Sequence, residues 1–516
     1  MHQRRISHLF SQLQVTVLAA ACLCLLFGAC SAPETAALPE QPNVLFIVVD
    51  DLNVALGTYH DYPTAKTPNL DRFASQGVQF DRAYAQDPVC NPSRTSFLSG
   101  RRPATTNVYG NFVEPRSHLG DVVMLPEYFD EHGYFTARVG KVAHGRYEAA
   151  VKWDVSENAT RREHYLPGVD HSEVRDNTWI EGSNDGLSRA DILGYLDRPT
   201  GMPLSWRATD ETEAETPDGQ TTRRVIELLR ENRDGPFFIA AGFHKPHQPW
   251  VAPKEFFQQH PISEVALPDE PADDTADIPA PALGNYPEDK DHSEEQVRQA
   301  IAAYHATITL MDVQVGLLME ALAELELESS TIVVFVSDHG FHLGEHGGLW
   351  RKHTQFEEST RVPLIVRIPG GVSGRSTSAL VELVDLYPTL ADLCGLPSPE
   401  GMEGISFRPV LEDPDVPWKS AIFSEAQRRG AHGRSVRTAR YRFTEWTPLE
   451  GDDDPQFELY DLENDPREYD NLAGDPEHQP TMDRLAAVLR NGWKAALPGV
   501  TEGSGDLYSA AGDQAE

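Results

Sequence analysis

The sequence predicts an α/β protein with a large, mainly parallel central sheet flanked by helices, followed by a smaller C-terminal α+β subdomain. Continuous apolar, β-branched runs recur along the chain, and such runs are typical of strands buried on both faces of a parallel sheet. Helical segments lie between them, as an α/β fold requires. Each run also ends in polar side chains, and ligands bind such sheets beyond the carboxyl ends of the strands.

The first predicted strand is Asn43–Val49, and it ends in Asp50 and Asp51. Adjacent carboxylates repel each other, so they need a reason to stand together. We interpret the pair as ligands of a cation, with a solvated turn as the alternative.

Three later runs repeat the pattern of a strand followed by polar groups. They are residues 133–139, before Lys141 and His144; residues 236–241, before His244; and residues 331–336, before Asp338 and His339. The carboxyl ends of parallel strands meet at one edge of a sheet. We therefore expect these side chains to form one polar site.

The remaining elements follow from periodicity and composition. Helices are expected over residues 70–76, 122–132 and 297–327, the last opened by a capping box of Ser293 and Gln296. Polar residues 154–222 and 261–291 are expected as surface insertions over the sheet. Strand-like runs at 421–424, 441–446 and 458–462, and a helix over about 481–496, predict the C-terminal subdomain.

The chain divides into five predicted segments. Residues 1–30 are expected to be a signal peptide of lipoprotein type, because two arginines precede an apolar stretch and Cys30 follows small residues. A linker (31–41), a catalytic domain (42–415), the C-terminal subdomain (416–497) and a disordered tail (498–516) follow. This predicts export to the periplasm or cell surface, either lipid-anchored at Cys30 or simply secreted.

Charge and cysteine content limit the function. The chain has 44 Lys+Arg against 80 Asp+Glu, a net charge of −36, which argues against nucleic acid as a partner. An anionic substrate would need a local basic cluster. Only Cys90 and Cys394 remain after Cys30, and although pairing is the default in an exported protein, we expect no disulfide because Cys90 is reserved for chemistry.

The chain is organised around the segment Cys90–Arg94, of sequence Cys-Asn-Pro-Ser-Arg. Pro92 favours the first position of a helix, so a helix is expected to begin there, with Cys90 just before its N-terminus. The helix dipole at that end favours an anionic thiolate. The alternative is a buried structural cysteine.

These motifs resemble the type I, formylglycine-dependent sulfatase family of the alkaline phosphatase superfamily, and most of all its iduronate-2-sulfatase branch. The resemblance covers roughly residues 42–493. It is carried by Cys-x-Pro-Ser-Arg followed by Gly100-Arg101, and by the runs Thr67–Arg72, Gly140–His144, Phe243–His247, Ser337–Gly340 and Gly433–Thr438.

The resemblance implies a catalytic apparatus. A formylglycine-generating enzyme would oxidise Cys90 to an aldehyde, whose hydrate attacks the sulfur with one hydroxyl and expels sulfate with the help of the other. The implied metal is one Ca²⁺ per chain, held by Asp50, Asp51, Asp338 and His339 beside the modified Cys90. The implied roles of the other residues are hydrate binding for Arg94, sulfate binding for Lys141 and Lys352, hydrate collapse for His144 and general acid for His244.

The predicted function is an exported sulfatase that acts on sulfate esters of glycans, specifically 2-O-sulfate on uronic acid residues. The alternatives are a phosphate or phosphonate monoesterase of the same superfamily, and a non-catalytic glycan-binding lipoprotein. Four histidines near the motifs are interpreted as surface residues: His247, His342, His346 and His353.

Overall fold

A computed structural model describes residues 38–60, 65–158, 194–196, 204–283 and 292–500. The predicted signal peptide, most of the linker and most of the tail lie outside these described residues. A nine-stranded sheet forms the centre, in the order β13-β2-β12-β9-β1-β7-β3-β4, with β14 paired to β2. Its strands are β1 (Asn43–Val49), β2 (Val78–Tyr84), β3 (Phe135–Gly140), β4 (Val155–Glu157), β7 (Phe237–Phe243), β9 (Thr331–Ser337), β12 (Arg361–Arg367), β13 (Arg375–Thr377) and β14 (Val381–Glu382).

The sheet is mainly parallel, as predicted. Strand β12 alone runs antiparallel to its neighbours β2 and β9. Strand β1 lies between β7 and β9, with Val49 opposite Phe243 and Ser337. The residues that follow these three strands therefore leave the sheet at the same edge.

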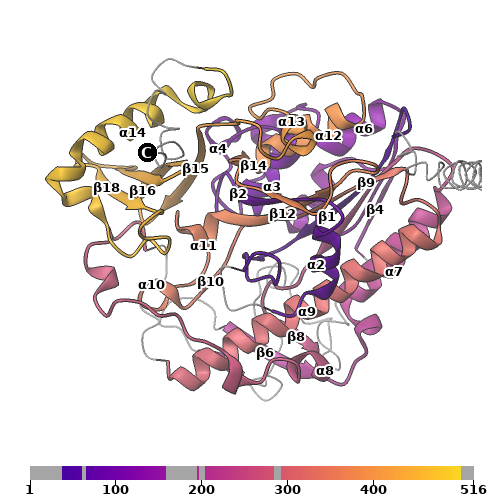
Figure 1. Cartoon of the computed structure of the whole chain (residues 1–516), viewed down its shortest axis with the longest axis horizontal. Coiled ribbons are helices and arrows are strands. Elements are labelled where there is room, and N and C mark those ends of the chain that lie inside the picture. Colours follow the sequence, from indigo (N-terminus) through magenta and orange to yellow (C-terminus); the bar gives the residue numbers. More distant parts are fainter. Residues whose placement is uncertain (1–37, 61–64, 159–193, 197–203, 284–291, 501–516) are drawn as a thin grey trace, which may run out of the picture. The chain divides into compact units, whose positions relative to one another are not determined.

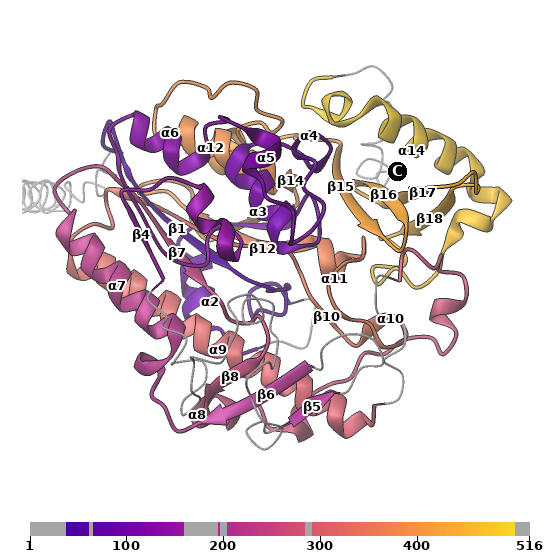
Figure 2. The same ribbon diagram turned by 180° about the vertical axis from the view of Figure 1, so that it is seen from behind.

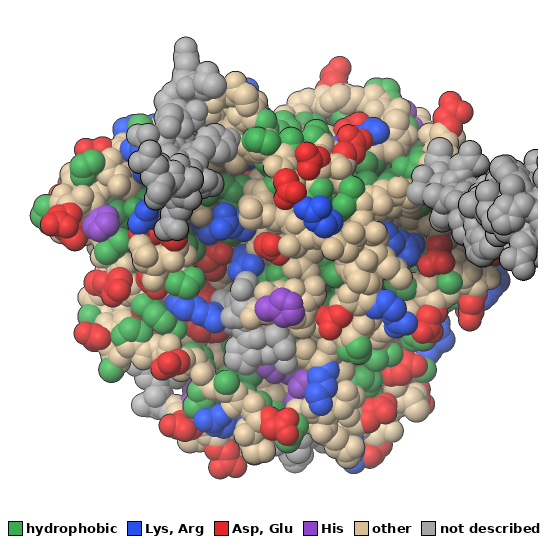
Figure 3. All heavy atoms as spheres, in the orientation of Figure 1, with side chains coloured by type: hydrophobic (Ala, Val, Ile, Leu, Met, Phe, Trp, Pro, Cys, Tyr) green, Lys and Arg blue, Asp and Glu red, His purple; other side chains and the backbone are tan. Residues whose placement is uncertain are grey.

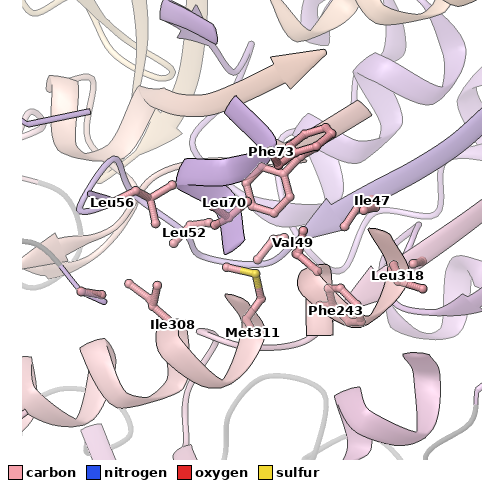
Figure 4. Packing of buried hydrophobic residues seen from close by; sticks show 14 of the residues in the cluster. Ile47, Val49, Leu52, Leu56, Leu70, Phe73, Phe243, Ile308, Met311 and Leu318 are labelled. Carbon is pink, nitrogen blue, oxygen red and sulfur yellow. The ribbon is translucent and has the colours of Figure 1, made fainter. Parts of the chain in front are cut away.

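Helices cover both faces of the sheet (Figures 1 and 2). One face carries α2 (Pro68–Ala74), α7 (Pro217–Glu231) and α9 (Glu294–Glu324), and the other carries α3 (Cys90–Ser99), α6 (Leu125–Glu131) and α12 (Leu386–Leu393). Alternate side chains of β1 point to opposite faces. Ile47 and Val49 pack with Met311 of α9, as Figure 4 shows, whereas Phe46 and Val48 pack with the α3 side. A strand buried on both faces must be apolar throughout.

Helix α9 begins at the predicted capping box. Ser293 Oγ accepts from the Gln296 amide at 3.3 Å, and Gln296 Oε1 accepts from the Ser293 amide at 3.0 Å. Among the described residues, α9 is the one helix long and apolar enough to cross a membrane, but 72% of its most apolar window is buried inside the protein. Its hydropathy is that of a core helix.

The prediction of a surface insertion over residues 154–222 is partly wrong. Its described part contains β4, β6 (Leu204–Thr209) and the first turns of α7, where Thr216 Oγ1 caps the Gly219 amide at 3.1 Å. Strand β6 pairs with β5 (Gly194–Leu196) and β8 (Trp250–Pro253) in a separate sheet. In the second insertion, the described part holds only short 3-10 turns, at Ile262–Glu264 and Asp274–Ala276.

The C-terminal antiparallel sheet is present as predicted. Its strands are β15 (Ala421–Arg428), β16 (Ala431–Thr438), β17 (Tyr441–Pro448) and β18 (Gln456–Asp461), and α14 (Gln479–Asn491) packs on it through Leu485. Strand β16 was not predicted. Its Gly433 leaves room for the Trp446 ring, because a Cβ there would lie 2.5 Å from that ring. The short remaining elements are α4 (Pro103–Thr106), α5 (Arg116–Leu119), α8 (Lys254–Phe257), α10 (Glu345–Gly348), α11 (Glu357–Thr360), α13 (Arg408–Glu412), β10 (His342–Leu343) and β11 (Trp350–Arg351).

Candidate active site

The polar pairs that follow β1 and β9, Asp50–Asp51 and Asp338–His339, meet at the predicted edge of the sheet. The Asp338 amide donates to Val49 O at 3.1 Å, and the Asp51 amide donates to Asp338 Oδ1 at 3.2 Å. Asp51 adopts φ 64°, a left-handed conformation that is unfavourable for a residue with a Cβ. The Tyr304 hydroxyl fixes this turn by donating to Asp51 O at 2.8 Å.

Cys90 is the first residue of α3, so the helix begins two residues earlier than predicted. Pro92 is still within the first turn, where its missing N–H is not needed. The Cys90 side chain is buried, and its Sγ lies 3.1 Å from Lys352 Nζ and 3.2 Å from His339 Nε2. Cys394 is also buried, and both cysteines are free.

The prediction that Cys90 favours the anionic form is wrong. Burial, reinforced by Asp50, raises the pKa of the Cys90 thiol to about 12. Loss of hydration outweighs the helix terminus and the nearby lysines. An unmodified Cys90 would therefore be a neutral thiol near pH 7, which is a poor nucleophile.

Arg94 joins Asp50 and Asp338 to the end of β3. Its Nε donates to Asp338 Oδ2 at 2.7 Å, its Nη2 lies 3.3 Å from Asp50 Oδ1, and its Nη1 donates to Lys141 O at 2.7 Å. Burial alone would lower the pKa of Arg94, but Asp338 and Asp50 outweigh it and raise that pKa. The predicted contact of Arg94 with a hydrate stays a prediction.

Two lysines neutralise the Asp50–Asp51 pair. Lys141 Nζ forms an ion pair with Asp50, and Lys352 Nζ forms one with Asp51. Burial would lower the pKa of each lysine, but the carboxylates outweigh it and raise both pKa values. Conversely, burial would raise the pKa of Asp50, but Lys141, followed by His247 and Arg94, holds it well below its usual range. All four groups are therefore charged at neutral pH.

Two glycines bring Lys141 to this site. Gly140 ends β3 with φ 84°, and a Cβ there would lie 2.1 Å from Gly242 O. Gly242 in turn approaches the backbone of Lys141, whose amide donates to Gly242 O at 2.9 Å. Only glycines allow the ends of β3 and β7 to approach this closely.

The two histidines predicted to take part in proton transfer lie after β3 and β7. His144 is buried, and its Nδ1 has no hydrogen-bond partner within the described part of the chain. The loop that carries His244 is fixed by Asp218 of α7, which accepts from the amides of His244 and Lys245 at 2.9 Å each. Burial, together with Lys141, lowers the pKa of both histidines well below the usual value, so both imidazoles are neutral at pH 7.

The interpretation of four nearby histidines as surface residues is wrong. His247, His342 and His346 are buried, and His353 is half-buried. His247 belongs to the site, because its Nε2 lies 4.0 Å from Asp50 Oδ2 and 3.9 Å from Asp51 Oδ2. Sequence reasoning missed both His247 and Asp218, although Pro246 and Pro249 on either side of His247 indicate a fixed loop.

One group of side chains among the described residues could hold a metal ion. The ligand atoms of Asp50, Asp51, Cys90 and His339 lie within 4.8 Å of one another, and all four residues are buried. Asp338, the fifth predicted ligand, is not in this group; its carboxylate accepts from Arg94 and from backbone amides. Its role as a metal ligand stays a prediction.

Comparison with known proteins agrees with this arrangement. The family model described as Sulfatase matches residues 42–396, and the model described as N-sulphoglucosamine sulphohydrolase, C-terminal matches residues 344–494. Iduronate 2-sulfatase of Mus musculus is 33% identical, over 88% of this chain and 96% of its own length.

Two solved structures are similar over most of the chain. A protein described as a 2-O GAG sulfatase has a TM-score of 0.65 and 26% identity, and the match covers 87% of this chain and 91% of that one. The phosphonate monoester hydrolase of Agrobacterium radiobacter has a TM-score of 0.71 over 87% and 96% of the two chains; its 22% identity shows the shared fold alone. The matched family, the relative and the buried cluster around Cys90 lead to one conclusion: this chain belongs to the sulfatase family and is a sulfuric ester hydrolase of the alkaline phosphatase superfamily.

Proposed function

We propose that this sulfatase, after export, removes 2-O-sulfate from uronic acid residues of sulfated polysaccharides or oligosaccharides, with formylglycine at position 90 and a bound Ca²⁺. The observation that carries the proposal is the position of Cys90 Sγ, which lies between Lys352 Nζ and His339 Nε2 beside two buried carboxylates. The likeness to iduronate 2-sulfatase and to a 2-O GAG sulfatase supports the choice of substrate.

The surroundings of position 90 fit an aldehyde hydrate better than a thiol. Such a group would supply a nucleophilic hydroxyl and a second hydroxyl for the release of sulfate. Cys90 Sγ stands in for one of these oxygens, and Lys352 Nζ is close enough to donate a hydrogen bond to it. The thiol itself is held neutral by burial, so it offers neither function.

The donor set fits a hard divalent cation once the sulfur is replaced by oxygen. Asp50 and Asp51 supply carboxylates, which suit Ca²⁺, and His339 supplies an imidazole, which is a less usual ligand for it. When bound, the cation would polarise the sulfate group and acidify the attacking hydroxyl.

The remaining charged groups suit a sulfate ester. Lys141 and Lys352 stay protonated because carboxylates raise their pKa values, so they can neutralise charge that develops on sulfate oxygens in a dry site. The neutral His244 can donate its ring N–H toward the departing sugar oxygen. These groups form the local basic cluster that an anionic substrate requires in a chain of net charge −36.

The test begins with protein made in a host that carries a formylglycine-generating enzyme. We expect the peptide that contains Cys90 to have the mass of the aldehyde, and Cys90→Ala protein to release no sulfate. Sulfate release is then measured from uronic acid disaccharides that carry a single sulfate, either at position 2 or at another position. The comparison shows which sulfate ester the enzyme cleaves. Chelation should abolish turnover, and added Ca²⁺ should restore it.

Three results would contradict parts of this proposal. If protein that carries the aldehyde releases no sulfate from any of these disaccharides, the proposed substrate class is wrong. Faster cleavage of a phosphonate monoester than of the matched sulfate ester would favour the phosphonate alternative instead. Restoration of activity by another divalent ion but not by Ca²⁺ would refute the calcium assignment alone.

Export and lipid anchoring are part of the same proposal and rest on residues 1–30. Cell fractionation tests them directly. Full-length protein should sediment with the membrane fraction, and Cys30→Ala protein should not. Recovery of both forms in the cytoplasmic fraction would contradict export.

A further inference from the structure

A second basic site lies away from Cys90, in a cavity of about 790 Å³. We call it the basic cavity. Its lining comes from α2, β2, the segment before and within β13, and the C-terminal sheet region, and none of the predicted catalytic or metal-binding residues belongs to it. Five arginines line it: Arg82, Arg361, Arg375, Arg437 and Arg467.

This concentration of arginine is unusual for so acidic a chain. The same lining contains three carboxylates, Asp71, Asp81 and Glu357, so the cavity carries an excess of positive charge while the chain as a whole carries −36. Figure 3 shows basic side chains interspersed with acidic ones over the face that carries α2. Acidic side chains elsewhere on the surface repel anions, so such a cavity is where an anion can bind.

The carboxylates of the cavity already have partners. Asp71 Oδ1 accepts from Thr67 Oγ1 at 3.2 Å, and Asp81 Oδ1 accepts from Gln79 Nε2 at 2.9 Å. Glu357 Oε1 lies 3.3 Å from Arg437 Nε. Two of the arginines have partners outside the lining: Arg375 lies 2.7 Å from Asp415, and Arg467 lies 3.8 Å from Glu358.

Arg82 is the clearest case of an uncompensated charge. Among the described residues, Arg82 forms no ion pair with a carboxylate, although its side chain is half-buried. Burial and the neighbouring Arg437 lower the pKa of Arg82, as expected for a cation placed beside another cation. Guanidinium groups bind sulfate and carboxylate oxygens well, because their paired N–H groups match two oxygens at once.

The other lining groups favour a sugar over an aromatic ligand. The lining also contains Thr58, Ser75, Ser376 and Ser378, and hydroxyl groups can bond to sugar hydroxyls. The hydroxyls of Thr58 and Ser75 already donate to Gln79 and to Arg72 O, so they would act as acceptors. Tyr59, the aromatic ring of this lining apart from His60, is buried, and its hydroxyl accepts from the Leu364 amide at 2.9 Å. It is thus held by the fold and does not offer a stacking face. Ligand cavities typically measure about 300–1,000 Å³, so this one can hold one or two sugar units.

We propose that the basic cavity is a second binding site for sulfate or carboxylate groups of a sulfated oligosaccharide, separate from the catalytic site. This rests on the proposed function, because it assigns the cavity to another part of the same polymeric substrate. The shared chemistry is an oxyanion held by arginine, and its source is either the glycan or free inorganic sulfate.

The test compares a long and a short substrate on wild-type holoenzyme, Arg82→Gln and Arg375→Gln. We expect each substitution to raise KM for a sulfated polysaccharide about tenfold, the usual cost of one charge-assisted hydrogen bond. KM and kcat for a sulfated disaccharide, which occupies the catalytic site alone, should not change. Arg408→Gln, an exposed arginine of α13 in ion pairs with Asp392 and Glu412, is the matched control and should change neither value.

Direct binding separates the outcomes. Calorimetry with a sulfated oligosaccharide should show a second site that is lost in Arg82→Gln; Arg375 is exposed, so its variant keeps the test valid if Arg82→Gln fails to fold. Weakened binding of inorganic sulfate in both variants, with an unchanged polysaccharide KM, would assign the site to free sulfate and overturn the glycan assignment. Equal KM ratios in all variants, with no second binding event, would overturn the proposal. Failure of the proposed function would appear differently, as absence of turnover of the disaccharide by the wild type.

Discussion

Lys352 is the residue on which the charge balance of the catalytic site depends most visibly. Its Nζ contacts both the Asp51 carboxylate and Cys90 Sγ, although it lies on the loop after β11, far along the chain from either. A single ammonium group thereby neutralises Asp51 and contacts the side chain at position 90.

Replacement of Lys352 by Met tests this role. The substitution keeps the length of the side chain but removes its charge, and loss of one preorganised donor typically costs about 10²–10³ in kcat. We expect that loss in steady-state assays, with partial recovery in Lys352→Arg. Lys254→Met, at an exposed ion pair with Asp210, is the control and should retain full activity. Wild-type kcat in Lys352→Met would show that the lysine is only structural.

Most residues of the candidate site were predictable because they follow apolar strands directly. Asp50, Lys141 and Asp338 stand within two residues of a strand end, and the topology of a parallel sheet brings such positions together. Asp218 was not predictable, because it acts through the backbone of a loop 26 residues later. Likewise, the thiol pKa of Cys90 follows from burial, which depends on packing that periodicity does not report.

At the scale of elements, the contact between the ends of β3 and β7 positions Lys141. Gly140 and Gly133 lie at the two ends of the same segment and have nearly equal φ values, 84° and 83°. They differ in the room available for a side chain. A Cβ at Gly140 would lie 2.1 Å from Gly242 O, whereas a Cβ at Gly133 would have no neighbour within 4 Å.

This pair separates backbone strain from steric exclusion. Gly133→Ala should cost about 1 kcal/mol in free energy of unfolding, the penalty of a left-handed alanine. Gly140→Ala should cost that amount plus about 1–3 kcal/mol for the forced separation of the strands, and should also lower kcat by displacing Lys141. Denaturant unfolding and steady-state assays measure both effects. Equal destabilisation by the two substitutions would contradict the steric explanation.

The strands were more predictable than the connections. Strand β1 was predicted to the residue because both of its faces are buried, and α9 was found through its capping box. Strand β16 escaped prediction because Gly433 and Arg434 interrupt its apolar pattern, and the glycine is needed only because the Trp446 ring from the next strand packs over it. Such long-range contacts override local propensity.

At the scale of the whole molecule, His346 joins three distant parts of the chain. It lies on α10, its Nδ1 is 3.2 Å from Asp274 in the second insertion, and its Nε2 is 3.7 Å from Glu358 of α11. Its ring also stacks on Phe356 at a centroid distance of 4.0 Å. Burial would lower the pKa of His346, but the hydrogen bond to Asp274 and the nearby Glu358 carboxylate outweigh it and raise that pKa to about 10.

This raised pKa gives a defined pH dependence of stability. Below about pH 6.5, the imidazole is protonated in both the folded and the unfolded chain, so its full contribution is present. Between about pH 6.5 and 10, the unfolded chain loses the proton while the folded chain keeps it, so the contribution declines as the pH rises, and it is lost above the folded pKa of about 10.

We therefore expect His346→Gln to lower the free energy of unfolding by about 3–5 kcal/mol at pH 6, because Asp274 and Glu358 remain buried without their cation. The difference from wild type should shrink toward pH 10. Urea unfolding at several pH values measures it, with the exposed His118→Gln of α5 as control. A difference that stays constant from pH 6 to pH 10 would show that His346 stabilises the fold by packing on Phe356 and not through its charge. A decline over this range would show instead that a buried ion pair ties the second insertion to α11, beside the strand end that carries Asp338 and His339.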